Sequence, residues 1–220
     1  MLKEIAKYPL KIKGSATAEL NEVKSPFNGE PIAAVAQADE AAIKMAITQA
    51  TETFHNTMKR MPAHKRSQIL ANTARLLGEQ HEEFARIIAL EGGKPIKDAR
   101  IEVSRAIMTF TVASEEALRL DGEQIAMDRQ VGNEGRIGLV MREPIGVIGA
   151  ITPFNFPLNL VAHKLAPAIA SGCTIVLKPA SQTPVSSLKL AEVLAQAGLP
   201  DGALVLTPCR GSKGLALVSD

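Results

Sequence analysis

Apolar residues in the first half of the chain recur every three or four positions, which places them on one side of a helix. Three such stripes follow one another, at residues 39–58, 62–93 and 95–121. Asp39 stands where it can cap the first helix, and Gly92–Gly93 stands where the backbone can leave the second. We therefore expect residues 39–121 to form one helical layer that lies on another apolar surface.

The period changes in the second half of the chain. Residues 137–141 alternate between apolar and small or polar side chains, which predicts an exposed strand in a hairpin. Further on, strands are expected at 145–151, 173–177 and 203–206, and helices at 158–170 and 184–197. Continuously apolar strands that alternate with helices predict βαβ units in a parallel sheet buried on both faces. Thr183 is expected to cap the second of these helices.

Composition narrows the class of protein. The 220 residues are 46% hydrophobic, which is enough to bury a core. The 25 basic and 23 acidic side chains leave a formal charge of +2, so no strong field attracts nucleic acid or an anionic membrane. No apolar run approaches the roughly 20 residues that cross a bilayer. The chain has only two cysteines, Cys173 and Cys209, which predicts a reducing compartment, by default the cytoplasm.

Candidate site residues follow the predicted strands, because ligands of open parallel sheets bind beyond the carboxyl ends of the strands. After the first strand, Asn155 stands between Pro153 and Pro157, immediately before a helix. Its amide can donate a hydrogen bond to a developing oxyanion. The alternative is that Asn155 merely caps the helix, and the residues alone leave both interpretations open.

Two further loops carry candidate phosphate or ribose contacts. Lys178 ends the second strand and Ser181 leads into a helix, although a solvated lysine at a strand end fits the same pattern. The third loop, Arg210–Gly214, offers Gly211 as a cofactor-binding candidate. Its signal is weak, because it contains neither the GxGxxG fingerprint nor a P-loop.

Other chemistry-bearing residues are poorer candidates. Cys209 lies beside Arg210, whose charge can lower a thiol pKa, yet no histidine or acid is spaced to activate it. Cys173 begins an apolar run, as buried cysteines often do. The four histidines stand singly without an HxxxH pairing, so no metal site is expected.

Six segments taken together resemble the aldehyde dehydrogenase superfamily. They are Ser25-Pro26-Phe27-Asn28-Gly29-Glu30, Leu90-Glu91-Gly92-Gly93-Lys94-Pro95, Glu143-Pro144-Ile145-Gly146-Val147-Ile148, Pro153-Phe154-Asn155-Phe156-Pro157, Ala166-Pro167-Ala168-Ile169-Ala170-Ser171-Gly172-Cys173 and Lys178-Pro179-Ala180-Ser181-Gln182-Thr183-Pro184. Each is weak alone, but the ordered set is specific and spans nearly the whole chain. The resemblance implies an α/β fold and NAD(P)-dependent oxidation of an aldehyde to an acid.

The resemblance also implies how the chain is organised. A parallel, Rossmann-like sheet would carry an N-terminal helical layer and a protruding β-hairpin. Residues 1–132 would supply the N-terminal strands and helices of a cofactor-binding domain, 133–143 an oligomerisation hairpin, and 144–220 a βαβ nucleotide-binding segment. The expected partners are an aldehyde substrate and further copies of the chain.

Carried over residue by residue, the resemblance gives roles to the first loop. Asn155 matches the asparagine that stabilises the oxyanion formed when a thiolate attacks the aldehyde. The backbone of Ile151, Thr152 and Pro153 would line the cofactor cleft. The first loop would thus serve both the substrate and the cofactor.

The second loop receives its roles in the same way. Lys178 matches the lysine that binds the adenosine ribose. Ser181 matches a position where NAD-preferring members often have a glutamate that holds both ribose hydroxyls. A neutral serine with Lys178 nearby removes charge repulsion against a 2′-phosphate, so the implied cofactor is NADP or NAD, with NADP at least tolerated.

The resemblance is incomplete at the chain's end. The family's nucleophilic cysteine, general-base glutamate and glycine-rich pyrophosphate turn all lie beyond Asp220, and neither Cys173 nor Cys209 has the nucleophile's context. We therefore expect an N-terminal portion that is inactive alone and has an unpaired sheet edge that promotes self-association. Two alternatives remain: a naturally short, non-catalytic module that binds cofactor or an oligomer partner, and an enzyme that uses Cys209 in an unrelated way.

Overall fold

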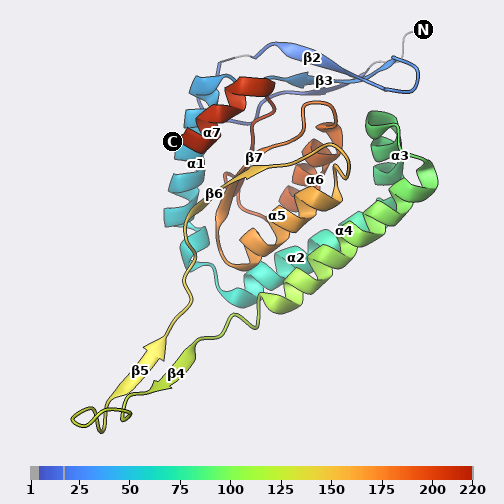
Figure 1. The fold of residues 1–220 in the computed structure, drawn as a ribbon. Coiled ribbons are helices and arrows are strands. Elements are labelled where there is room, and N and C mark those ends of the chain that lie inside the picture. Colours follow the sequence, from blue (N-terminus) through green and yellow to red (C-terminus); the bar gives the residue numbers. More distant parts are fainter. Residues whose placement is uncertain (1–4, 17, 220) are drawn as a thin grey trace.

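The computed structural model describes residues 5–16 and 18–219, with elements in the predicted order (Figure 1). Helix α1 (Glu40–Asn56) begins where the sequence predicts, because the Asp39 side chain accepts a hydrogen bond from the Ala42 amide at 2.8 Å. A 3₁₀ turn, η1 (Met58–Arg60), then leads through Pro62 into α2 (Ala63–Glu79). Pro62 restarts the helix because its fixed φ suits a helix start.

The helix predicted at residues 62–93 is in fact two helices. α2 ends at Glu79 and α3 (His81–Gly92) begins after Gln80, whose φ of −104° and ψ of 19° leave the helical region. Leu77 and Phe84 are fully buried on either side of the break, so the apolar spacing continues across it and does not reveal it. The helical pattern does end as predicted at Gly93, which adopts a left-handed φ of 63°.

Helix α4 (Ile96–Glu116) follows Pro95 and ends before the predicted Asp121. Leu118 and Leu120, which continue the apolar stripe, are 55% and 44% exposed. A helical turn gains most of its stability from burying its apolar side, and these two leucines are not buried here. The predicted last turn is therefore absent.

A parallel three-stranded sheet, in the order β6–β7–β8, lies between the helices. Its strands are β6 (Val147–Ile151), β7 (Thr174–Lys178) and β8 (Leu204–Leu206), connected by α5 (Asn159–Ala170) and α6 (Val185–Gln196). The predicted βαβ units are confirmed. The predicted burial on both faces holds for β7 but is wrong for the edge strands, since Ile151 in β6 is 46% exposed. An apolar run indicates what a strand can bury, not which neighbours cover it.

The single helical layer predicted for residues 39–121 is divided between the two faces of the sheet. Val176 and Val205 pack with α1 on one face, whereas Ile175 and Leu177 belong to the core formed with α2 to α6. Successive side chains of a strand point to opposite faces, so these are the two sides of one sheet. Figure 1 shows α1 apart from α2, α4 and α5. Periodicity identifies the apolar side of each helix but not the face that it covers.

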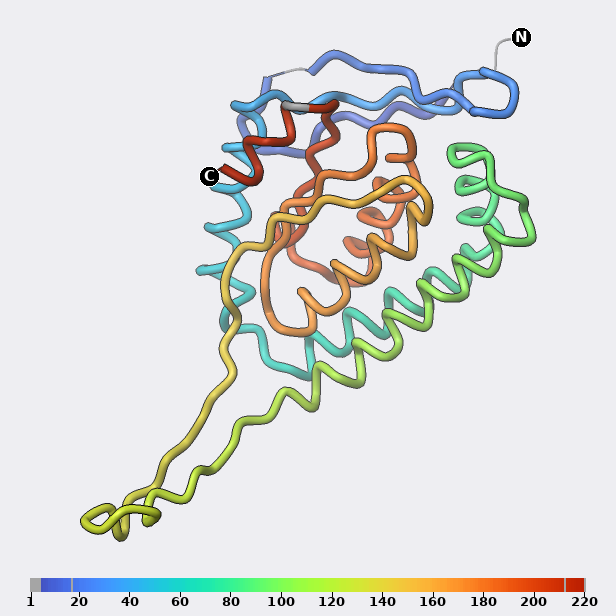
Figure 2. The backbone as a smooth tube through the Cα atoms, in the orientation of Figure 1, coloured from blue at the N-terminus to red at the C-terminus, as the bar shows by residue number. Residues whose placement is uncertain are grey.

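Two smaller sheets flank this core. β1 (Ala6–Tyr8), β3 (Pro31–Ala36) and β2 (Leu20–Lys24) form a three-stranded sheet in that order near the N-terminus. β4 (Glu123–Ala126) and β5 (Ile137–Val140) form an antiparallel hairpin that projects from the body (Figure 2). Its first strand lies upstream of the segment 133–143 in which the hairpin was expected. The described chain ends with η2 (Gly211–Leu215) and α7 (Ala216–Ser219), near α1.

Candidate functional site

Three loops meet at the carboxyl edge of the parallel sheet. The Thr152 amide donates to the Lys178 carbonyl at 3.2 Å, and the Thr207 amide donates to the Leu177 carbonyl at 2.8 Å, so the sheet's hydrogen bonding extends into the loops. The Ser181 hydroxyl donates to the carbonyl of Cys209 at 2.9 Å, which joins the second loop to the third. The loops in which the sequence places candidate residues therefore lie together, at the edge where open parallel sheets bind ligands.

Two of the predicted site residues, Ser181 and Gly211, line one cavity of about 630 Å³. Gln182, Arg210 and Phe154 line it as well, as do residues of β2 and of α3. The guanidinium of Arg210 and the amide and hydroxyl groups of the second loop can donate hydrogen bonds to an anionic group. Lys178, Asn155 and residues 151–153 are not among the lining residues of this cavity.

Lys178 lies half-buried at the tip of β7, against the third loop. A Cβ atom at Gly214 would lie 2.7 Å from its Cδ and Cε atoms, so the lysine stem fits there only because residue 214 has no side chain. The Lys178 ammonium lies 3.5 Å from the Pro179 carbonyl. Gly211, by contrast, has open space around its Cα and a φ of 49°. The close approach of the Lys178 side chain to the third loop therefore requires glycine at position 214, a residue that the sequence did not single out.

Asn155 is exposed in the loop before α5, and it does not cap that helix. The amides of Leu158, which immediately precedes α5, and of Asn159, its first residue, donate to the Glu102 Oε1 atom at 2.9 and 3.1 Å. The capping interpretation is therefore excluded, because a carboxylate from α4 already fills that role. Among the described residues, the side-chain amide of Asn155 has no hydrogen-bond partner, so a ligand can engage it.

The loop that contains Asn155 is held by Lys94, which the sequence showed only as part of the family resemblance. The Lys94 ammonium donates to the Asn155 carbonyl at 2.8 Å and to the Glu102 carboxylate at 2.5 Å. It also lies 4.0 Å from the centroid of the Phe156 ring. One cation thus contacts two successive residues of the loop and the carboxylate that caps the next helix.

Glu91 caps α6 as Glu102 caps α5. Its carboxylate accepts hydrogen bonds from the Val185 amide at 2.7 Å and the Ser186 amide at 3.0 Å. Burial raises the pKa of Glu91 to about 7, although the hydrogen bonds from residues 185 and 186 favour the charged form. The prediction that Thr183 caps α6 was wrong, since its buried hydroxyl has no hydrogen-bond partner among the described residues and the Glu91 carboxylate caps the helix instead.

One signal for these buried carboxylates was present in the sequence. Glu102 lies three residues after Ala99 and four before Ala106, on the buried side of α4. A charged residue in an apolar stripe is rarely buried without a partner, so it marks a buried polar contact. The identity of the partner, 56 or more residues away along the chain, is not encoded in that local pattern.

The two cysteines do not have the environment of an activated nucleophile. Burial raises the pKa of the Cys209 thiol, and the charges of Lys178 and Lys213 offset that effect only in part. A thiol with a raised pKa stays protonated at neutral pH, which argues against catalysis by Cys209. Cys173 is buried as well. In residues 5–16 and 18–219, no group of three or more His, Cys, Asp or Glu side chains is arranged to hold a metal ion.

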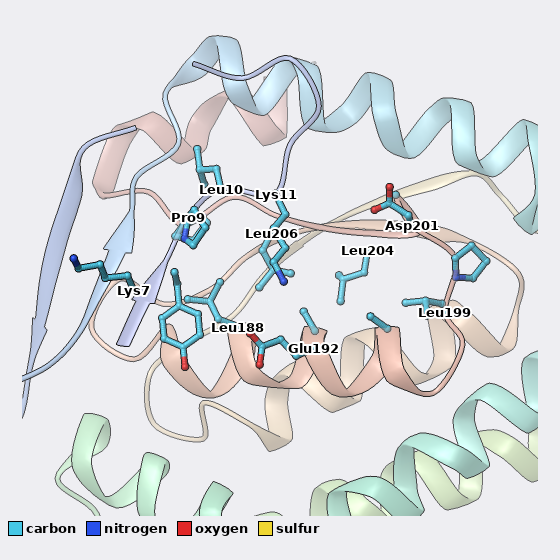
Figure 3. A pocket seen from close by; sticks show the side chains of 16 residues that line it. Lys7, Pro9, Leu10, Lys11, Leu188, Glu192, Leu199, Asp201, Leu204 and Leu206 are labelled. Carbon is cyan, nitrogen blue, oxygen red and sulfur yellow. The ribbon is translucent and has the colours of Figure 1, made fainter. Parts of the chain in front are cut away.

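A second cavity, of about 230 Å³, lies beside α6 and β8 and is bounded by residues 7–11 of the N-terminal region (Figure 3). Leu188, Leu204 and Leu206 are among its apolar walls, and Glu192 and Asp201 are among its charged residues. It shares no lining residue with the cavity at Ser181. None of the predicted site residues lines it, so it is distinct from the candidate site.

Comparison with known proteins places the chain in a family. The model of the aldehyde dehydrogenase family matches residues 12–220. A curated relative, 3-sulfolactaldehyde dehydrogenase of Priestia aryabhattai, is 42% identical over 209 residues, which are 94% of this chain and 43% of the relative. The chain therefore spans less than half the length of that relative. None of its described helices has the length and apolar character needed to cross a membrane.

Solved structures of family members share the fold. Aldehyde dehydrogenase 21 from Physcomitrella patens, in complex with the reaction product succinate, matches with a TM-score of 0.92 and 40% identity, over 99% of this chain and 46% of that one. The NAD+ complex of an aldehyde dehydrogenase from Bacillus cereus matches with a TM-score of 0.89 and 30% identity, over 97% and 44% of the two chains.

A further relative was solved with the other nicotinamide cofactor. NADP-dependent glyceraldehyde-3-phosphate dehydrogenase from Bacillus halodurans C-125, complexed with NADP, matches with a TM-score of 0.90 and 36% identity, over 96% and 46% of the two chains. Relatives in this family thus bind NAD+ or NADP. With its family segments, its fold and its sequence matched over residues 12–220, the chain belongs to the aldehyde dehydrogenase family.

Proposed function

We propose that the chain is the cofactor-binding part of an enzyme that oxidises an aldehyde to a carboxylic acid with NADP or NAD. The meeting of three loops at the carboxyl edge of the parallel sheet carries this proposal. Ser181 is bonded to the third loop there and lines a cavity with Gly211. Nucleotides bind at that edge in open parallel sheets, and relatives with this fold bind NAD+ or NADP.

Each candidate residue has a role in this proposal. Lys178 and Ser181 bind the adenosine ribose, and the backbone of residues 151–153 lines the cleft. Gly211 allows the cofactor to approach the backbone of the third loop. The exposed amide of Asn155 donates a hydrogen bond to the oxyanion that forms when the aldehyde is attacked. The cofactor, when bound, supplies the hydride acceptor.

The charges at the second and third loops favour NADP. Ser181 is neutral, so it does not repel a 2′-phosphate. Arg210 lines the same cavity, and a guanidinium pairs well with a phosphate group. We propose that this enzyme accepts NADP at least as well as NAD. The proposal that the 2′-phosphate lies in this cavity rests on Ser181 and Arg210.

The remaining chemistry requires groups that residues 5–16 and 18–219 do not present in a catalytic arrangement. Oxidation of the aldehyde needs a nucleophile and a base, and the described cysteines are buried. We propose that the chain alone binds cofactor but does not turn over an aldehyde. Cofactor binding can therefore be measured on this chain separately from catalysis.

Calorimetric titration of the folded chain with NADP and with NAD tests the proposal. We expect micromolar binding of NADP, and weaker or equal binding of NAD. Circular dichroism of the same sample checks that the chain is folded. Failure of a folded chain to bind either dinucleotide would contradict the cofactor-binding role, and a clear preference for NAD would contradict the assignment of the 2′-phosphate site.

A second candidate function is that of an oligomer-partner module, and the projecting hairpin favours it. Ile137, Leu139 and Met141 on or beside β5 are 72%, 71% and 79% exposed. Exposed apolar side chains grouped on a projecting hairpin mark an interaction surface. Light scattering tests this candidate: association that is lost in Leu139→Lys supports it, whereas a monodisperse monomer contradicts it.

A further inference from the structure

We propose that Lys94, held in place by Glu102, is a positioning residue that fixes the loop of Asn155. The role of Asn155 as an oxyanion donor rests on the proposed function. The contacts of Lys94 do not, because they lie entirely within the chain. Lys94 would thus keep the exposed side-chain amide of Asn155 at a defined place without any direct bond to that amide.

Three contacts converge on the Lys94 ammonium. It donates to the Glu102 Oε2 atom at 2.5 Å and to the Asn155 carbonyl at 2.8 Å, and it lies over the Phe156 ring. A lysine ammonium has three donors, and attraction to an aromatic face adds a further favourable term. The ammonium thereby holds the backbone of residue 155 and the side chain of residue 156 together.

Glu102 secures both the lysine and the end of the loop. Its side chain is fully buried, while that of Lys94 is 16% exposed. One carboxylate oxygen binds Lys94, and the other accepts from the Leu158 and Asn159 amides that begin α5. The loop is therefore fixed at its middle by Lys94 and at its end by Glu102, and these two anchors are bonded to each other.

The neighbouring chain restricts the loop further. Pro153 and Pro157 flank the three residues Phe154, Asn155 and Phe156, and a proline ring fixes its own φ. With the Asn155 carbonyl bonded to Lys94, few backbone torsions remain free to move the exposed amide. Positional precision of this kind is what an oxyanion donor requires, since a displacement of about 1 Å can cost two orders of magnitude in rate.

Relaxation measurements by nuclear magnetic resonance test the inference on the chain itself. We compare the wild type with Lys94→Met, with the conservative Lys94→Arg, and with Lys97→Met, which removes an exposed lysine three residues further on, in the first turn of α4. In the wild type, the amides of Asn155 and Phe156 should have order parameters near about 0.85, typical of rigid backbone. In Lys94→Met they should fall below about 0.6, while Lys94→Arg and Lys97→Met stay rigid.

A merely structural role would not give this pattern. General loosening would also lower the amide order parameters of residues 180–183 in the second loop, which Lys94 does not contact, and these should stay unchanged. Because Lys94→Met leaves a buried carboxylate unpaired, the double variant Lys94→Met/Glu102→Gln provides the same comparison without a lone charge. Its Asn155 and Phe156 amides should be mobile as well.

Two results would overturn the inference. One is a mobile Asn155 loop in the wild type, which needs no variant. The other is a loop that stays rigid in a folded Lys94→Met or double variant. Neither depends on cofactor binding, so failure of the wild type to bind NADP would count against the proposed function and leave the positioning role standing.

Discussion

Helices α5 and α6 begin in closely similar ways, and the difference between them lies in charge. Each follows one of the candidate loops, and each has its first amides bonded to a glutamate from the outer helices, Glu102 for α5 and Glu91 for α6. Glu102 also pairs with Lys94, whereas Glu91 has no ion-pair partner among the described residues. A carboxylate at a helix N-terminus is stabilised by the helix dipole, but burial opposes its charge.

Both helices need an acceptor for their first amides, and the two buried glutamates that supply it differ in whether a cation balances their charge. At α5 a cation compensates the buried charge and at the same time holds the Asn155 loop. At α6 the charge is uncompensated, and burial raises the pKa of Glu91 to about 7. The contacts at the start of α5 therefore favour a fixed geometry. At the start of α6, the Glu91 carboxyl changes its protonation near neutral pH. It does so beside the cavity that Ser181 and Glu91 both line.

Removal of the Lys94 cation should have the largest effect on the free energy of unfolding. Lys94→Met leaves the Glu102 carboxylate buried without its partner, which we expect to lower the free energy of unfolding by about 3 kcal/mol. Urea denaturation measures the change. The exposed Lys97→Met should stay within about 0.5 kcal/mol of the wild type, and Lys94→Met/Glu102→Gln should regain most of the loss. Equal effects of the two single lysine substitutions would contradict the compensation at α5.

The α6 start should make stability depend on pH. The pKa of Glu91 is raised from 4.5 when unfolded to about 7 when folded, so its stabilising contribution is fully present below about pH 4.5 and is lost as pH rises through 7. Between pH 5 and pH 8 the wild type should lose on the order of 3 kcal/mol relative to Glu91→Gln, which cannot ionise.

Urea denaturation of both proteins at a series of pH values measures that difference. Glu102→Gln provides a comparison at the other helix start, because it removes the equivalent carboxylate from α5. A wild-type curve that runs parallel to that of Glu91→Gln from pH 5 to pH 8 would show that Glu91 does not titrate in this range. The contrast between the two helix starts would then fail.

A negative charge in the second loop should weaken the binding of NADP. Ser181→Glu places a carboxylate in the cavity that Arg210 lines, where it repels a 2′-phosphate. We expect the dissociation constant for NADP to rise by about tenfold or more, which corresponds to at least about 1.4 kcal/mol. Calorimetry of Ser181→Glu and of the neutral control Ser181→Ala measures this. A rise in Ser181→Ala as large as in Ser181→Glu would assign the effect to the lost bond to Cys209 and not to charge.

The smallest effect is expected at Asn155. Because Glu102, and not Asn155, caps α5, Asn155→Ala should change the free energy of unfolding by less than about 0.5 kcal/mol. Thermal and urea unfolding check this. A loss of about 1 kcal/mol or more, the usual cost of removing a helix cap, would contradict the assignment of the cap to Glu102 alone.

Local patterns in the sequence were enough to predict most of the elements. The Asp39 cap, the end of a helix at Gly93 and the βαβ order all depend on residues close together in the chain. The break at Gln80 was missed because buried apolar residues continue on both sides of it. The position of α1 on the opposite face of the sheet was missed because periodicity carries no information about which face a helix covers.

In the candidate site, too, local features could be predicted and long-range contacts could not. The sequence located its loops, because the position after a buried strand is a local property, and Ser181 and Gly211 do line one cavity. It could not identify what holds those loops. Glu91 and Glu102 act on helices that begin 94 and 57 residues further along the chain, and the Lys94 ammonium donates to a carbonyl 61 residues away. Such pairings arise only when the helices pack.

Mapping NADP onto the chain by nuclear magnetic resonance tests whether the three loops at the sheet edge form a cofactor site. Amide resonances of the isotopically labelled protein would be followed during a titration with NADP. We expect shifts at Lys178, Ser181 and Gly211, with the amides of residues 201–204 beside the smaller cavity unchanged. Shifts confined to that smaller cavity, or none at saturating NADP in a folded chain, would contradict it.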